Sequence, residues 1–244
     1  MAFKSEEQPG EPGLGAEVVG QDFEGGKIAS SSHGTYGVPS QIVDLYEDWL
    51  GVPISPVETR NAVTLQLFEA GVVYSSDGGG YAVRAEVDEY AQGWFPISAE
   101  EDIAAATTAG RAQRFKDASG LEMTVYSARD TGVHGVAGPR LDLYERLGGP
   151  GSSLGFPMSD SIPYLDGYGG RQSQKFEHGV IYHQTRADPV AVPAETVELV
   201  GFRRLGWPTS EERLVGDNTD ESIQFFEMGV VTVRDGKREF WLRP

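Results

Sequence analysis

The sequence predicts a mainly β protein with short helices, built as a five-unit propeller-like ring. Three observations predict it. A Phe-Glu-x-Gly motif recurs in four clear copies and one degenerate copy, a proline turn precedes four of these five copies, and short β-branched runs follow the motif. A unit of about 45–50 residues cannot bury its own apolar face, so neighbouring units must stack on one another.

The first motif is Phe-Glu-x-Gly followed by Ile or Val. Clear copies begin at Phe23-Glu24, Phe68-Glu69, Phe176-Glu177 and Phe226-Glu227, and a degenerate copy begins at Phe115. The runs that follow are β-branched or aromatic and are bounded by glycine, which is typical of strands. Each copy therefore predicts a short pair of strands around the motif.

The second motif is a turn that reads Leu-Gly-x-Pro in three copies and Gly93-Trp94-Phe95-Pro96 in the fourth, followed two residues later by serine. Its prolines are Pro53, Pro96, Pro157 and Pro208, and its serines are Ser55, Ser98, Ser159 and Ser210. The serines are expected to cap turns by accepting a backbone N–H a few residues further on. The repeated glutamates are expected to accept backbone N–H or hydroxyl hydrogen bonds, because an active site needs one asymmetric pair rather than one copy per unit.

Short helices are expected after each pair of strands, at residues 40–49, 85–91, 140–147 and 194–202. Proline or Val-Pro opens three of them, which suits the first helical turn because its N–H groups lack intrahelical partners. Ile42, Leu45, Tyr46 and Trp49 follow the i, i+3, i+4, i+7 spacing of one helical face. The tetrapeptide at 44–47 recurs at 142–145.

The predicted organisation is a flexible tail at 1–13 and a single repeat domain at 14–244. Its units cover about 14–49, 50–92, 93–153, 154–204 and 205–244. The first unit has at most a poor turn motif, Gly13-Leu14-Gly15, and the last ends without a helix. Two missing halves suggest a ring closed by pairing of the N- and C-terminal pieces, which would remove exposed strand edges. An open solenoid is the competing geometry.

These motifs resemble the LGFP repeat of actinobacterial proteins. The likeness is clearest at residues 154–160 and 174–182 and extends over roughly 14–244. It implies a propeller-like ring of small blades. It also implies a non-catalytic accessory role beside cell-wall enzymes such as mycoloyltransferases, amidases or esterases, holding them on the arabinogalactan-containing envelope.

Composition excludes several functions. The 244 residues hold 20 Lys and Arg against 37 Asp and Glu, a net charge of −17. This charge repels nucleic acid and disfavours anionic membranes and polymers. No apolar run approaches the ~18 residues of a membrane-spanning helix. Cysteine is absent, so there is no disulfide or thiol nucleophile. We expect a monomer without a cofactor.

The sequence is compatible with two cellular locations. Residues 1–10 have no apolar segment of the kind found in secretory signals. A fragment of a secreted protein would be associated with the cell wall, and otherwise the protein would be cytoplasmic.

For each candidate catalytic or metal-binding residue, a structural role is favoured over a chemical one. We therefore expect neither an enzyme nor a metal site. Residues 151–155 match G-x-S-x-G but lack the strand and helix of a nucleophile elbow, and a turn is expected instead. The histidines His33, His134, His178 and His183 lack helical metal-ligand spacing. The acidic stretch at 217–221 is interpreted as a solvated loop.

Six aromatic residues are the candidate ligand-binding set. They are Tyr74, Tyr126 and Tyr182 after the β-branched runs, and Phe95, Phe156 and Trp207 in the turns. Such rings can bind neutral sugar faces, or they can fill the core between units. The expected function is binding of a neutral cell-wall polysaccharide such as arabinogalactan. The alternative is an acidic protein-interaction or structural module, inside the cell or in a phage particle.

Overall fold

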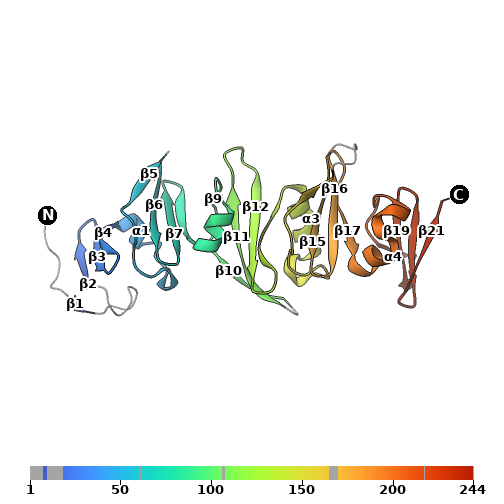
Figure 1. The fold of residues 1–244 in the computed structure, drawn as a ribbon, viewed down its shortest axis with the longest axis horizontal. Helices are drawn as coiled ribbons and strands as arrows, with labels where there is room; N and C mark the ends of the chain where they lie inside the picture. The colour runs from blue at the N-terminus through green and yellow to red at the C-terminus, as the bar shows by residue number, and fades with distance from the viewer. Residues whose placement is uncertain are drawn as a thin grey trace. The chain divides into compact units, whose positions relative to one another are not determined.

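The computed structural model describes residues 8–9, 19–60, 62–105, 108–164, 170–216 and 218–243. They form a mainly β fold with short helices, as the sequence predicted (Figure 1). Of the tail predicted at 1–13, the two residues Gln8–Pro9 are described, as strand β1. Gly13-Leu14-Gly15 and Asp217 lie outside the described residues.

Five antiparallel sheets follow one another along the chain. The first holds β1 (Gln8–Pro9), β2 (Val19–Phe23), β3 (Gly26–Ser31) and β4 (Gly34–Pro39). The second holds β5 (Glu58–Arg60), β6 (Val63–Phe68), β7 (Gly71–Ser76) and β8 (Gly79–Arg84). The third holds β9 (Phe95–Pro96), β10 (Glu101–Ala104), β11 (Ala109–Lys116), β12 (Glu122–Ala128) and β13 (Gly132–Ala137).

The last two sheets have four strands each. The fourth holds β14 (Ile162–Pro163), β15 (Arg171–Phe176), β16 (Gly179–Gln184) and β17 (Val190–Pro193). The fifth holds β18 (Arg213–Val215), β19 (Asn218–Phe226), β20 (Gly229–Arg234) and β21 (Lys237–Leu242). We name the repeats 1 to 5 by these sheets and call the contact between consecutive repeats a junction.

The chain divides into two compact units. The first contains residues 1–101 and 113–125, and the second contains residues 102–112 and 126–244. Repeats 1 and 2 therefore lie in the first unit and repeats 4 and 5 in the second, while the strands of repeat 3 are divided between them.

The predicted five-unit closed propeller is not confirmed. None of the described sheets closes, and each is made of strands that are consecutive in the chain. The expected pairing of N- and C-terminal pieces is absent from these sheets, because β1 pairs with β2 and β21 pairs with β20. With the short strands β1 and β18, the first and last sheets have four strands each. Neither of these two sheets takes a strand from the other.

The Phe-Glu-x-Gly motif forms a hairpin with a two-residue turn. Its Phe pairs with its Gly at Phe23↔Gly26, Phe68↔Gly71, Phe176↔Gly179 and Phe226↔Gly229. The glycine is needed for close packing: a Cβ at Gly179 would lie 2.6 Å from Cδ2 of Leu154 and 2.7 Å from the carbonyl oxygen of Val192. In repeat 3 a longer turn replaces this hairpin, and Asp117 accepts N–H groups from Ser119 and Leu121 there.

The helices are α1 (Ser40–Val43), α2 (Ala85–Tyr90), α3 (Pro139–Leu147) and α4 (Ala194–Leu205). The helix expected at 40–49 ends at Val43, because the N–H groups of Leu45 and Tyr46 bond only three residues back and Glu47 is extended. A 3-10 turn, Asp48–Leu50, follows. The predicted apolar face still forms, with Leu45, Tyr46 and Trp49 packed against the cluster that holds buried Ile42.

The core lies between repeats. One cluster joins Val38 of repeat 1 to Phe68 and Val73 of repeat 2. Another joins Tyr126 of repeat 3 to Phe176 of repeat 4, with Tyr144 from α3 between them. Stacked neighbours thus complete each other's cores, as the repeat length predicted.

Candidate functional site

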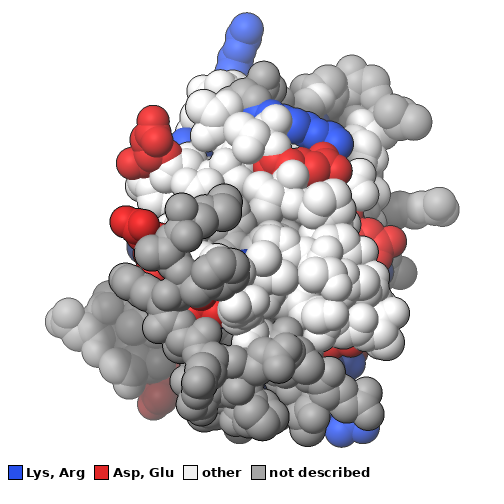
Figure 2. Space-filling view, turned by 90° about the vertical axis from the view of Figure 1, so that its left-hand side faces the viewer, with Lys and Arg blue, Asp and Glu red and all other residues white. Residues whose placement is uncertain are grey.

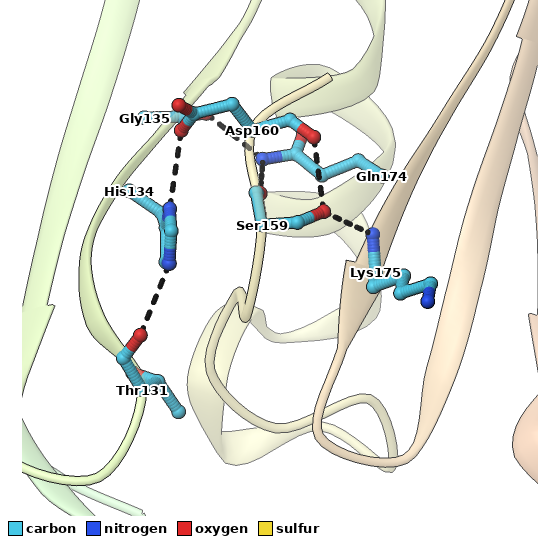
Figure 3. A network of polar contacts seen from close by, with 7 residues as sticks. All are labelled: Thr131, His134, Gly135, Ser159, Asp160, Gln174 and Lys175. Atoms are coloured by element: carbon cyan, nitrogen blue, oxygen red, sulfur yellow. Dashed lines mark hydrogen bonds and ion pairs between the residues drawn. The ribbon is translucent and has the colours of Figure 1, made fainter. Parts of the chain in front are cut away.

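The junctions hold a polar network that recurs from repeat to repeat. Its centre is a buried glutamine two residues before the motif Phe. In Figure 3, Nε2 of Gln174 donates to the carbonyl oxygens of Gly135 in β13 and Ser159 in the turn, both at 2.9 Å. The other three junctions repeat this arrangement with Gln66 on Gly37 and Ser55, Gln113 on Ala82 and Ser98, and Gln224 on Ala191 and Ser210. Each glutamine therefore ties its own turn to the last strand of the preceding repeat.

The turn serines hold the turn against a strand. The hydroxyl of Ser159 donates to the carbonyl of Asp160 and accepts the N–H of Lys175 at 3.1 Å (Figure 3). Ser55, Ser98 and Ser210 accept in the same way from Leu67, Arg114 and Phe225. The expectation of a partner a few residues away was wrong, because the accepted N–H belongs to the strand that ends at the motif Phe. The motif prolines Pro53, Pro96, Pro157 and Pro208 bridge to that same Phe.

The motif glutamates accept backbone N–H groups, as the sequence predicted, and they also cross the junction. Glu177 accepts the N–H of Phe156 at 2.7 Å through Oε2 and the hydroxyl of Thr108 at 2.6 Å through Oε1. Glu69 accepts the N–H of Val52 and lies 3.0 Å from Nε2 of His33. Glu227 accepts the N–H of Trp207 and pairs with Arg171. The side-chain partner comes from the preceding repeat each time. Glu24 is exposed at the surface.

The junction of repeats 2 and 3 has a different cross-link. Lys116 follows Phe115 where the other copies have glutamate. Here Nε of Arg84 donates to both carboxylate oxygens of Glu100, at 3.0 and 2.8 Å, with both side chains largely buried. The guanidinium also lies 4.2 Å from the ring centre of Trp49. The ion pair between Arg84 and Glu100 thus links repeats 2 and 3, as the motif glutamate links the repeats at the other junctions.

The six candidate aromatic residues meet in pairs inside the junctions. Each tyrosine packs edge-on against the turn ring of the next repeat, with ring centres 6.0 Å apart for Tyr74 and Phe95, 6.4 Å for Tyr126 and Phe156, and 5.1 Å for Tyr182 and Trp207. Tyr74 and Phe95 are half-buried, and the other four are buried. The buried rings serve as core, so they present no free face on which a sugar could stack.

Burial raises the pKa values of two tyrosines in the junctions. Desolvation raises the pKa of Tyr74, and the hydrogen bond that it donates to Asp88 at 2.6 Å raises it further. Desolvation likewise raises the pKa of Tyr144, whose hydroxyl donates to the carbonyl of Gly155 at 2.5 Å. These phenols stay protonated and act as donors.

Three of the four histidines have separate partners, and that of His33 is Glu69. His134 contacts Asp160 at 3.1 Å and the carbonyl of Thr131 at 3.0 Å (Figure 3). His183 lies 3.4 Å from Nη1 of Arg140, and burial followed by that charge lowers its pKa. His178 lies in the turn between β15 and β16. Across the described ranges no three metal-ligating side chains gather.

The G-x-S-x-G stretch forms a turn. Ser152 donates to the carbonyl of Gly149 at 2.6 Å and accepts the N–H of Leu154 at 3.2 Å. It follows the 3-10 turn Gly149–Gly151 and precedes the Leu-Gly-x-Pro motif. This placement differs from the strand-to-helix turn of a nucleophile elbow.

A groove opens at the junction of repeats 4 and 5. Its volume is about 590 Å³, and Tyr182 and Trp207 contribute to its wall. The charged residues that line it are Arg146, Asp188, Glu211, Glu212, Arg213 and Glu227. Two of these residues form an ion pair, with Nη2 of Arg146 3.0 Å from Oε1 of Glu211, and both side chains are exposed. The groove combines apolar ring edges with paired hydrogen-bonding groups.

Comparisons with known proteins give one family match. Residues 95–152, which run from β9 through α3, match the model of a family described as the LGFP repeat. A search of curated protein sequences returns no significant match. Among the described helices none has the length and apolarity needed to cross a membrane.

Proposed function

Because the chain is an LGFP-repeat protein, we propose that it is a non-catalytic binding module for a neutral cell-wall polysaccharide such as arabinogalactan. The repeats supply a scaffold, and the groove at the junction of repeats 4 and 5 is the binding site.

The groove is the observation that supports this proposal. Its volume of about 590 Å³ lies within the range of roughly 300–1,000 Å³ common for ligand sites. The carboxylate of Glu211 and the guanidinium of Arg213 offer planar acceptors and donors to sugar hydroxyls. Glu212, also in the lining, is held by Ser222 and Arg238. The net charge of −17 favours a neutral over an anionic polymer.

Isothermal titration calorimetry with soluble arabinogalactan fragments tests the proposal. The double variant Arg146→Ala/Glu211→Ala removes the exposed pair that lines the groove and should weaken binding at least tenfold. The matched control is Arg60→Ala/Glu58→Ala, which removes an exposed pair of repeat 2 at 2.6 Å that lies outside the groove lining. Absence of heat with the wild-type protein, or equal binding by both double variants, would refute the proposal.

The absence of catalysis is part of the same proposal. Ser152 is held in a turn by two hydrogen bonds, and the motif glutamates are occupied by backbone N–H groups. Incubation of the protein with polysaccharide and ester substrates should release no product above the buffer control.

A protein partner is the second candidate, and strand β21 favours it. Trp241 and Leu242 are each 58% exposed on this strand, which pairs with β20 and stands last in its sheet. An apolar sheet edge of this kind can pair with another chain. Recovery of a stoichiometric protein with the wild type, and its loss with Trp241→Ser, would favour this candidate over the polysaccharide.

A further inference from the structure

The groove at the junction of repeats 4 and 5 is rich in charge. Figure 2 shows a face of the molecule on which most of the described atoms belong to uncharged residues. In the groove, by contrast, six of the fifteen described residues that line it are charged, against 23% of the whole chain. The contacts of these six side chains separate those that are paired within the protein from those that can serve a ligand.

Three of the four carboxylates in the groove are paired with arginines. The pairs are Glu211–Arg146, Glu212–Arg238 and Glu227–Arg171. Glu212 also accepts the hydroxyl of Ser222, and Glu227 accepts the N–H of Trp207. The charge of each carboxylate is thus compensated within the chain, and a ligand hydroxyl would have to share it with the arginine.

The other two charged residues of the groove are Asp188 and Arg213, and both are exposed. Within the part of the chain that the structure describes, neither side chain has a hydrogen bond or an ion pair. Cζ of Arg213 lies 5.1 Å from the ring centre of Phe225, a contact that leaves the guanidinium N–H groups able to donate. Asp188 acts electrostatically on His183, but burial and Arg140 lower the pKa of His183, so this histidine is neutral at pH 7 and does not compensate the carboxylate.

These two residues come from the two repeats that form the groove. Asp188 lies in the loop between β16 and β17 of repeat 4, and Arg213 is the first residue of β18 in repeat 5. An ionised carboxylate only accepts hydrogen bonds, and a guanidinium only donates them. A ligand held by both must therefore offer hydroxyl donors to one and oxygen acceptors to the other, and it must contact both repeats.

The aromatic rings of the groove are already packed. Trp207 and Tyr182 are buried against each other with ring centres 5.1 Å apart, and the guanidinium of Arg171 lies 5.0 Å from the Trp207 ring centre. Stacking of a sugar needs a free ring face. Recognition in this groove therefore depends on its polar side chains.

We propose that Asp188 and Arg213 determine the specificity of this groove, and that together they bind a neutral oligosaccharide that spans repeats 4 and 5. The Asp188 carboxylate accepts hydrogen bonds from two neighbouring hydroxyls of one sugar, and the Arg213 guanidinium donates to oxygens of the adjoining sugar. Hydrogen bonds to a charged group are roughly twice as strong as those between neutral groups. This inference rests on the proposed polysaccharide function and adds which side chains recognise the ligand.

Isothermal titration calorimetry with soluble arabinogalactan fragments compares the wild type with Asp188→Asn and Arg213→Gln. Each substitution removes the charge of one exposed side chain, and each variant should bind at least tenfold more weakly. The double variant should lose about the product of the two factors, because the two side chains contact different sugars. The two substitutions change the net charge in opposite directions, so a general charge effect would not weaken binding in both.

The matched controls are Arg186→Gln and Asp235→Asn. Arg186 lies in the same loop as Asp188, and Asp235 lies in the turn between β20 and β21 of repeat 5. Both are exposed and are outside the groove lining, so both controls should bind like the wild type. Circular dichroism verifies that all four single variants retain the fold.

Hydrogen exchange followed by mass spectrometry tests the bridging of the two repeats. Bound fragments should slow amide exchange both in the loop at 184–190 and in the turn at 207–213, which form the two sides of the groove. Slower exchange in only one of these segments would overturn the inference.

The calorimetry also separates this inference from the function on which it rests. Binding by the wild type that neither Asp188→Asn nor Arg213→Gln weakens would overturn the inference and leave the polysaccharide function standing. Equal weakening by these variants and by the controls would overturn it as well. Absence of binding by the wild type would refute the proposed function and, with it, the assignment of these two residues.

Discussion

At the scale of single residues, one buried amide per junction stands out. The glutamine two residues before the motif Phe spans two carbonyls of different repeats, and its position recurs at Gln21, Gln66, Gln113, Gln174 and Gln224. The glutamine is visible in the sequence two residues before the Phe of all five copies, although the motif defined from the sequence begins only at the Phe. Its partners could not be predicted, because they are backbone carbonyls brought close by the stacking of repeats.

Replacement of Gln174 by Leu should lower the free energy of unfolding by about 1–3 kcal/mol, because it leaves two buried carbonyls without their donor. Urea denaturation measures the loss. Gln21→Leu is the matched control, since that glutamine is half-buried in repeat 1, and it should cost clearly less. Equal losses for the two variants would show that the amide contributes nothing specific to the junction.

Gly155 shows why the turn needs glycine. Its φ is +70°, and a Cβ would collide with the Glu177 carboxylate. Gly155→Ala should therefore lose more stability than Gly93→Ala, whose φ is +86° but whose Cβ would meet nothing within 4 Å. Strain at positive φ costs about 1–2 kcal/mol at both sites, so the difference in thermal unfolding isolates the glutamate contact. Identical shifts would place the whole effect in backbone strain.

At the scale of elements, the hairpins were predicted well and the helices less so. Local sequence fixes the hairpin, because Phe-Glu-x-Gly holds both the paired ends and the turn. The helix after β4 stops at Val43 although its apolar spacing continues to Trp49. A turn and a 3-10 segment bury the same side chains, so periodicity alone could not distinguish them.

Phe176→Ala should lower the free energy of unfolding by about 3–5 kcal/mol, the cost typical of removing a buried ring. Phe176 is buried among Tyr144, Phe156 and Ile181 at the end of β15. Chemical denaturation gives the value. A loss below about 1 kcal/mol would mean that the neighbours collapse into the space.

Tyr74 ties β7 to α2 through its hydrogen bond to Asp88, which makes this contact sensitive to alkali. Its pKa is raised in the folded protein and is about 10 in an unfolded chain. The stability that it contributes is thus complete below pH ~10 and is lost as the pH rises above that value. Tyr74→Phe should be less stable than the wild type at pH 8, by about 0.5–1.5 kcal/mol.

The two stability curves should converge as the pH rises beyond 10, because ionisation removes the same hydrogen bond from the wild type. Unfolding curves in urea at a series of pH values follow this convergence. A constant difference between the two proteins at every pH would contradict the assignment.

At the scale of the whole molecule, the stacking of repeats was predicted correctly and the ring was not confirmed. Stacking follows from the size of a repeat, which is a property of the sequence. Closure was inferred from incomplete ends, and the two-residue strand β1 and the three-residue strand β18 are too short to be recognised by pattern. The polar cross-links were equally hidden, since each pairs side chains that are far apart in the chain.

The exposure of Ile28 in β3, which is 38%, predicts a difference in local stability between repeats. A strand whose central side chain is exposed makes fewer buried apolar contacts and opens more readily. Amide protons of β3 should exchange with solvent at least tenfold faster than those of β7 or β16, whose central residues Val73 and Ile181 are fully buried. Hydrogen exchange followed by NMR or mass spectrometry measures the rates. Uniform protection across the three strands would contradict the prediction.

The junction cross-links differ in chemistry, and this gives the repeats a fixed order. The motif glutamates contact three different side chains of the preceding repeat, with the pairs Glu69–His33, Glu177–Thr108 and Glu227–Arg171. At the junction of repeats 2 and 3 the cross-link is instead the ion pair between Arg84 and Glu100. A chain with repeats 2 and 4 exchanged would bring Arg171 to a repeat that has Lys116 in place of the motif glutamate, so Arg171 would lose the partner that Glu227 supplies in the natural order. The modules therefore share a shape without being interchangeable, and shuffled versions of this protein should assemble poorly even though every module keeps its own sequence.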